Sequence, residues 1–130
     1  MSISPMQRTL AVLRENGGKP WIVEKSIPSK PWPTKIDLYN IIDVVNMTKD
    51  FKFQGVQICG TDFAQHDDKI LASSDSLWWL RCGNTLELWG WRQLLKKRGG
   101  KAKIWVPRIK IYTVSDFDSD KIKNKSVVIK

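Results

Sequence analysis

Residues 36–59, which read IDLYNIIDVVNMTKDFKFQGVQIC, are the stretch that decides the fold. They hold two short apolar runs rich in β-branched residues, at 41–45 and 55–59, with a polar connection at 46–50. Two such runs with a polar turn between them predict a β-hairpin that is buried on at least one face. Each run has a polar residue at its centre, Asp43 in the first and Gln57 in the second.

These two polar residues are the first candidates for a functional site. A carboxylate in a buried strand needs a partner or a metal ion to offset its loss of hydration. On adjacent strands, Asp43 and Gln57 could share one cation through their oxygen atoms, and oxygen is the ligand that Mg²⁺ prefers. A cation site in the hairpin is therefore one hypothesis, and a hydrogen-bonded core aspartate is the other.

The segments before the hairpin add two further acidic residues. A helix is predicted from Ser4-Pro5, an N-cap followed by proline, to the glycines at 17 and 18. A strand over 20–26 carries Glu24, which joins the site only if it meets Asp43, and the proline-rich stretch 28–33 is a loop. Asp37 is equally well interpreted as a cap at the start of the hairpin or as another ligand.

After the hairpin, the pattern predicts a helix over 62–73, a short helix or turn over 75–80, and strands over 85–91 and 103–114. Gly90 suggests a bulge in the first of these strands, and Pro107 suggests that the second either lies at a sheet edge or contains a bulge. The order of elements predicts an α/β fold in which a mixed sheet of about five strands is flanked by helices. We expect one domain over 1–115 and a mobile or weakly docked tail over 116–130.

The net charge of +9 is concentrated in one part of the chain. The window from Trp91 to Lys110 contains no acidic residue, and the rest of the chain is nearly balanced, with 14 basic and 13 acidic residues. A localised basic surface is typical of polyanion binding, and the Gly99-Gly100 pair inside the run favours a loop that contacts phosphates. The basic residues are Arg92, Lys96, Lys97, Arg98, Lys101, Lys103, Arg108 and Lys110.

Several classes of protein do not fit the composition. No apolar run approaches the length of a membrane span, and the first ten residues lack the apolar core of a signal peptide. Cys59 and Cys82 stand apart without CxxC spacing, and His66 is the only histidine, so a zinc site is not predicted. We expect two reduced thiols in a cytoplasmic protein that does not bind a membrane.

The pieces described above stand in the order of a known superfamily. The chain first has the segment DLYNIIDVV at 37–45, then GVQIC at 55–59, and then a predicted helix with a lysine at 62–71. A strand that ends in WGWR follows at 86–92, and a basic loop with two glycines leads to a strand with tryptophan at 96–106. This order resembles the PD-(D/E)XK nuclease superfamily, in particular its small phage and bacterial members and the Holliday junction resolvases. The resemblance covers about residues 5–114 and implies a restriction-endonuclease-like core.

The resemblance also implies roles for individual residues. Asp43 matches the metal-binding aspartate, and Gln57 matches the acidic residue of the (D/E)XK triplet, which some members replace by glutamine. Cys59 occupies the position of the triplet's lysine, and Lys69 on the following helix is the natural substitute, as in members that move their lysine there. Glu24 resembles the early acidic residue, and the backbone carbonyl of Ile58 would complete the ligands of a Mg²⁺ ion, for which Mn²⁺ could substitute.

Two functions follow as expectations. The first is a metal-dependent DNA endonuclease, in the host cytoplasm if the gene belongs to a phage, acting on plain duplex, a junction or a nick. The second is a DNA-binding protein that keeps the fold without cleavage, which the residues at 57 and 59 favour. A homodimer is a further expectation, because superfamily members often pair in order to cut two strands.

Overall fold

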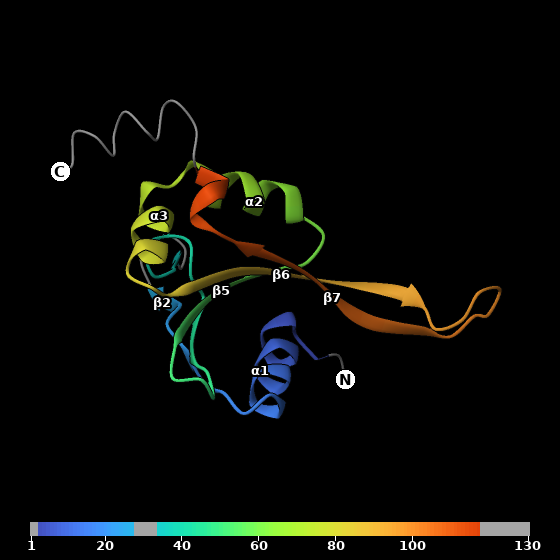
Figure 1. The fold of residues 1–130 in the computed structure, drawn as a ribbon. Helices are drawn as coiled ribbons and strands as arrows, with labels where there is room; N and C mark the ends of the chain where they lie inside the picture. The colour runs from blue at the N-terminus through green and yellow to red at the C-terminus, as the bar shows by residue number, and fades with distance from the viewer. Residues whose placement is uncertain (1–2, 28–33, 118–130) are drawn as a thin grey trace.

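A computed structural model describes residues 3–27 and 34–117 and shows an α/β fold built on a five-stranded mixed sheet (Figure 1). The strand order is β1-β4-β5-β6-β7. Only β5 and β6 pair in parallel, and the other neighbours are antiparallel. The predicted mixed sheet of about five strands is therefore confirmed. The strands are β1 (Lys19–Ile22), β4 (Val44–Met47), β5 (Phe53–Cys59), β6 (Thr85–Leu95) and β7 (Lys103–Tyr112).

The single strand predicted over 20–26 was wrong. The chain forms β1 in the main sheet and then β2 (Lys25–Ile27), which pairs with β3 (Thr34–Ile36) in a separate two-stranded sheet. The division has a local cause, because the backbone N–H groups of Val23 and Glu24 both donate to the carbonyl of Asp43, at 2.9 and 3.2 Å. This converging pair ends the β1–β4 ladder. The predicted loop over 28–33 lies outside the described residues.

The hairpin at the centre of the fold forms, with its first strand shifted. β4 begins at Val44 rather than Ile41, because residues 38–42 make a tight turn in which the N–H of Ile42 donates to the carbonyl of Leu38 at 3.0 Å. In this turn Tyr39 and Asn40 adopt left-handed φ angles of 54° and 62°. Asp43 therefore lies at the junction between the turn and the strand.

Helices cover both faces of the sheet (Figure 1). On one face, α1 (Pro5–Glu15) begins where the Ser4 hydroxyl accepts the N–H of Gln7, as the sequence predicts, and it buries Leu10 and Leu13 against the sheet. On the other face lie α2 (Phe63–Ala72) and α3 (Ser74–Arg81). Their core includes the buried residues Ile42, Ile70, Leu77, Leu86, Leu88 and Tyr112.

Two polar contacts tie the helices to the sheet. The buried indole N–H of Trp91 on β6 donates to the hydroxyl of Thr9 on α1, at 2.8 Å. On the opposite face, the Asp67 carboxylate of α2 accepts hydrogen bonds from Lys110 and Tyr112 of β7. Burial alone would raise the pKa of Asp67, but these two hydrogen bonds lower it.

Strands β6 and β7 continue beyond the body of the protein as a two-stranded arm (Figure 1). The predicted strand over 85–91 continues to Leu95, and Leu95 pairs with Lys103, so the basic connection that joins the strands is shorter than predicted. β7 lies at the edge of the sheet and its register with β6 is continuous through Pro107, so of the two alternatives for this proline the edge position is the one that forms.

The predicted bulge at Gly90 was wrong, because Gly90 keeps an unbroken register with Cys59 on one side and Arg108 on the other. The absence of a side chain has another reason. A Cβ atom at this position would lie 2.6 Å from the ring of Phe63 on α2. Gly90 therefore allows α2 to pack closely on the sheet.

The described chain ends in a short 3-10 helix, Val114–Phe117, whose Phe117 is buried near Tyr112. Residues 118–130 of the predicted tail lie outside the described residues. None of the helices in the described part combines the length and the apolar character that crossing a bilayer requires.

Candidate metal centre and basic arm

Three carboxylates from separate segments meet beside the first residue of β4. Oxygen atoms of Glu24, Asp37 and Asp43 all lie within 4.8 Å of one another. The backbone explains why they meet. Lys25 pairs with Ile36, so the adjoining residues Glu24 and Asp37 leave the small sheet side by side, and the N–H of Glu24 bonds to the carbonyl of Asp43. We call these three residues the carboxylate cluster.

Asp43 is the most buried member of the carboxylate cluster, with 5% of its surface exposed. Its Oδ2 accepts the backbone N–H of Ile58 at 2.8 Å and the side-chain amide of Gln57. Burial, followed by the neighbouring Asp37 carboxylate, raises the pKa of Asp43 to about 7, although the bond from Ile58 acts in the opposite direction. The site thus concentrates negative charge in a place poorly supplied with water.

Gln57 lies against the carboxylate cluster and contacts it through its side-chain amide. Its side chain is 1% exposed, and its Nε2 donates to Asp43 and, at 3.4 Å, to Asp37. Its Oε1 is buried and has no hydrogen-bond partner among the described residues, although such groups are normally satisfied. A half-turn of the amide exchanges the two atoms, so that Oε1 would join the carboxylate oxygens in a set of hard oxygen ligands. The residues therefore fit a divalent cation.

A lysine also reaches the carboxylate cluster. Lys69 on α2 places its Nζ 3.9 Å from the Oδ2 of Asp37. α2 follows β5 after a short connection, so the helix carries Lys69 back over the strand that holds Gln57. Cys59, two residues beyond Gln57, is buried, and burial raises the pKa of its thiol to about 11. The thiol is therefore neutral near pH 7 and supplies no charge.

The structure brings together Glu24, Asp43, Gln57 and Lys69 from the sequence-predicted site. Asp37, which the sequence left open between a cap and a ligand, belongs to the carboxylate cluster. Ile58 contributes its N–H to Asp43, and a role for its carbonyl as a ligand stays a prediction. The spacing of Asp37, six residues before Asp43, was the only sequence signal for its membership.

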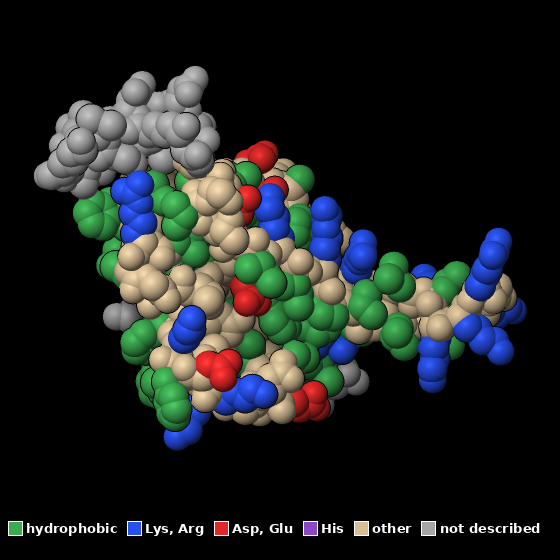
Figure 2. Space-filling model, in the orientation of Figure 1, with side chains coloured by type: hydrophobic (Ala, Val, Ile, Leu, Met, Phe, Trp, Pro, Cys, Tyr) green, Lys and Arg blue, Asp and Glu red, His purple; other side chains and the backbone are tan. Residues whose placement is uncertain are grey.

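The basic residues lie along the arm formed by β6 and β7. Figure 2 shows Lys and Arg side chains along this arm and around its tip. Arg92 is exposed on β6, Lys103 begins β7, and residues 96–102 form the tip that carries Lys96, Lys97, Arg98 and Lys101. Arg108 lies closer to the body, with its guanidinium 4.0 Å from the ring centroid of Phe63 at the start of α2. Arg108 therefore lies on the sheet face that also carries Gln57 and Lys69.

Comparison of the chain with protein-family models, with curated proteins and with solved structures finds no significant match.

Proposed function

We propose that this chain is a metal-dependent DNA endonuclease with a restriction-endonuclease-like core. The observation that carries the proposal is the meeting of the carboxylate cluster with a buried, half-satisfied glutamine and a lysine. The order of elements supports it: α1, an antiparallel hairpin bearing Asp43 and Gln57, the α2 crossover with Lys69, and a parallel strand β6. This is the order that the superfamily resemblance implies.

The chemistry gives each residue a task. Asp43, Asp37 and Glu24 offer carboxylate oxygens, and Gln57 offers a neutral amide oxygen, to a Mg²⁺ ion for which Mn²⁺ could substitute. Such an ion lowers the pKa of a bound water and neutralises charge on the phosphate. The Lys69 ammonium would hold the attacking water or stabilise the negative charge that develops on the phosphate.

The basic arm supports DNA as the substrate. A two-stranded ribbon fits the major groove of a duplex, and its lysines and arginines can contact phosphates without reading sequence. Arg92, Lys96, Lys97, Arg98, Lys101, Lys103 and Arg108 make up this surface. A homodimer, which would place two sites on two strands, remains a prediction.

A second candidate function is DNA binding without cleavage. The buried neutral thiol of Cys59 at the position of the superfamily's lysine favours it, as does the neutral amide of Gln57 in place of a carboxylate. The position of Lys69 favours cleavage instead, because it returns a cation to the carboxylate cluster.

A cleavage experiment separates the two candidates. Labelled linear, nicked and four-way-junction DNA would be incubated with Mg²⁺, Mn²⁺ or EDTA and with wild type, Asp43→Ala or the control Asp50→Ala, whose exposed residue lies in the β4–β5 turn. Metal-dependent cutting that Asp43→Ala abolishes and Asp50→Ala retains is the expected result. DNA binding without cutting in either metal would favour the second candidate. If the protein neither binds nor cuts DNA, both candidate functions are contradicted.

A further inference from the structure

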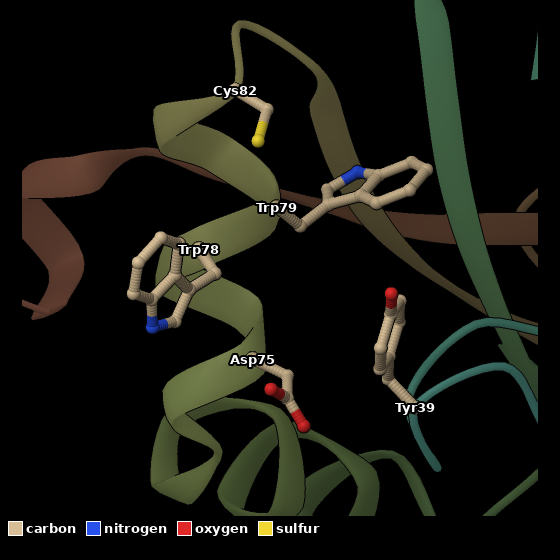
Figure 3. A pocket seen from close by; sticks show the side chains of 5 residues that line it. All are labelled: Tyr39, Asp75, Trp78, Trp79 and Cys82. Atoms are coloured by element: carbon tan, nitrogen blue, oxygen red, sulfur yellow. The ribbon is translucent and has the colours of Figure 1, made fainter.

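A pocket lies between α3 and the turn that precedes Asp43. It has a volume of about 320 Å³ and is lined by Tyr39, Asp75, Trp78, Trp79 and Cys82. Figure 3 shows Asp75 and Trp79 on the side of α3 that faces Tyr39. A pocket of this size is at the small end of the range for ligand sites, so its occupant is a small group rather than an extended chain.

The walls of the pocket are aromatic and unusually exposed. Tyr39 and Trp78 have 58% and 52% of their surfaces in solvent. The indole N–H of Trp79 donates to the backbone carbonyl of Thr85 at 2.7 Å, which fixes that ring as a rigid wall. Flat, solvent-exposed aromatic rings are the surfaces on which unpaired nucleobases stack.

The pocket and the carboxylate cluster share one turn of the backbone. Asp37 begins this turn, and its carbonyl accepts the N–H of Asn40 at 3.1 Å. Tyr39 is two residues beyond Asp37, so their Cα atoms are at most about 7 Å apart. Buried Ile41 and Ile42 anchor the end of the turn and hold Tyr39 outward in its left-handed conformation. A DNA strand at the cluster would therefore have the pocket as its immediate neighbour.

We propose that this pocket receives one unpaired nucleobase of the DNA strand held at the carboxylate cluster, an inference that rests on the proposed function. The Asp75 carboxylate repels a phosphate and accepts a hydrogen bond from an exocyclic amino group, so adenine, cytosine and guanine, which have such a group, are preferred over thymine, which has none. In fully paired DNA the bases are stacked and would have to be flipped out at a cost. The preferred substrates are therefore DNA forms with unpaired bases, such as gaps and flaps.

The exposed thiol of Cys82 offers a direct test of occupancy. Cys59 is buried and Cys82 is exposed, so a maleimide labels Cys82 selectively. In EDTA, which prevents metal-dependent cutting, we expect saturating oligo-dA or oligo-dC to slow the labelling of Cys82. A fully paired DNA hairpin at the same fractional saturation of the protein would leave the labelling rate unchanged.

Substitutions test the individual walls of the pocket. Tyr39→Ala would weaken single-strand binding by about fivefold or more, which is the low end of the effect of losing one stacked base. Binding of fully paired DNA would stay the same. Asp75→Asn would reduce the preference for adenine and cytosine over thymine. The matched control is Phe51→Ala, because Phe51 is 97% exposed and shares the left-handed φ of Tyr39, at 63°.

The outcomes distinguish this inference from the proposed function. Three outcomes would each overturn the nucleobase site without contradicting the proposed nuclease. Paired DNA could protect Cys82 as well as single strands do, or protection could grow with protein concentration in the absence of DNA. The pocket variants could also bind single strands as tightly as Phe51→Ala does. If single strands protect Cys82 selectively but the protein cuts no DNA, the result would support the nucleobase site and contradict the proposed nuclease activity. Failure to bind DNA of any form would overturn both.

Discussion

Asp43 is the residue at which the fold and the candidate chemistry conflict most. Its backbone N–H joins the β4–β5 region through the carbonyl of Val56 at 2.9 Å, so the position cannot move out of the sheet. Its side chain is then held in a buried place next to Asp37. A charged group that is held where its charge is unfavourable is a frequent mark of a functional site.

The first prediction concerns the pH dependence of stability at this residue. Because the pKa of Asp43 rises from 3.8 to about 7 on folding, the native state binds a proton more tightly than the unfolded state. In metal-free buffer this term makes the free energy of unfolding fall as the pH rises from about 4 to about 7, by at most about 1.4 kcal/mol per pH unit. Urea denaturation in EDTA across this range would measure it.

Asp43→Asn removes this titration, so its free energy of unfolding would depend less on pH than that of wild type over the same range. Asp50→Asn, at an exposed site, would keep the wild-type dependence. If the free energy of unfolding depends on pH in the same way for wild type and Asp43→Asn, the pKa of Asp43 does not change on folding.

The second prediction concerns Gln57. Gln57→Glu adds a negative charge to the carboxylate cluster, so the metal-free protein should become less stable while Mn²⁺ binding becomes tighter by about tenfold, or about 1.4 kcal/mol. Titration calorimetry and the shift of the unfolding temperature with Mn²⁺ would report the two effects. Metal binding that is equally weak in Gln57→Glu and Asp43→Ala would contradict a cation site at this cluster.

At the scale of elements, the arm and the packing of α2 on the sheet give two further predictions. The arm extends away from the hydrophobic core, since its residues beyond Trp91 are exposed on β6. Its charges can therefore be removed without disturbing the core.

The third prediction is that Lys97→Ala combined with Arg98→Ala weakens DNA binding and reduces the salt dependence. If each side chain contacts one phosphate, the slope of log K against log salt falls by about 2 for duplex DNA. Lys49→Ala combined with Lys52→Ala, at the β4–β5 turn, removes the same charge from another part of the molecule. An equal change of slope in both double variants would indicate diffuse charge rather than a binding arm.

The fourth prediction tests the close approach of α2. Gly90→Ala would place a methyl group 2.6 Å from the Phe63 ring, so we expect a loss of about 1–3 kcal/mol in the free energy of unfolding. Gly60→Ala is the control, because no atom of the part of the chain that the structure describes lies within 4 Å of its added Cβ. Chemical denaturation measures both, and equal stabilities would mean that α2 moves away easily.

At the scale of the whole molecule, one face of the sheet carries the candidate chemistry and the other carries structural support. Gln57, Lys69 and Arg108 lie on the face covered by α2 and α3, and the pocket proposed for a nucleobase is bounded by α3 as well. α1 covers the opposite face and is tied to it by the Thr9–Trp91 hydrogen bond. The basic arm extends beyond the body of the protein, away from the carboxylate cluster, so DNA binding and cleavage should be separable by substitution.

The fifth prediction states this separation. Asp43→Asn should bind DNA at least as tightly as wild type, because it removes a negative charge near the phosphates, but it should not cut. The Lys97→Ala and Arg98→Ala double variant should raise KM and keep kcat, because its residues lie far out on the arm. Filter binding and steady-state cleavage would compare them, and loss of kcat in the arm variant would contradict the division of tasks.

The sequence by itself determined the elements whose causes are local. Ser4-Pro5 predicts the start of α1, the β-branched runs predict the central hairpin, and Pro107 predicts an edge strand. The concentration of basic residues between Trp91 and Lys110 was also visible from composition alone. These features depend on propensities and periodicities that act over a few residues, and a single sequence records them directly.

Only the tertiary structure decided which side chains meet. The small β2–β3 sheet brings Glu24 beside Asp37, and the crossover of α2 brings Lys69 to the same carboxylates. The pocket between Tyr39 and α3, and the close packing that explains Gly90, likewise join segments far apart in the chain. Such contacts depend on strand register and on the paths of the connections between elements. The hydrophobic pattern within one segment predicts neither of these.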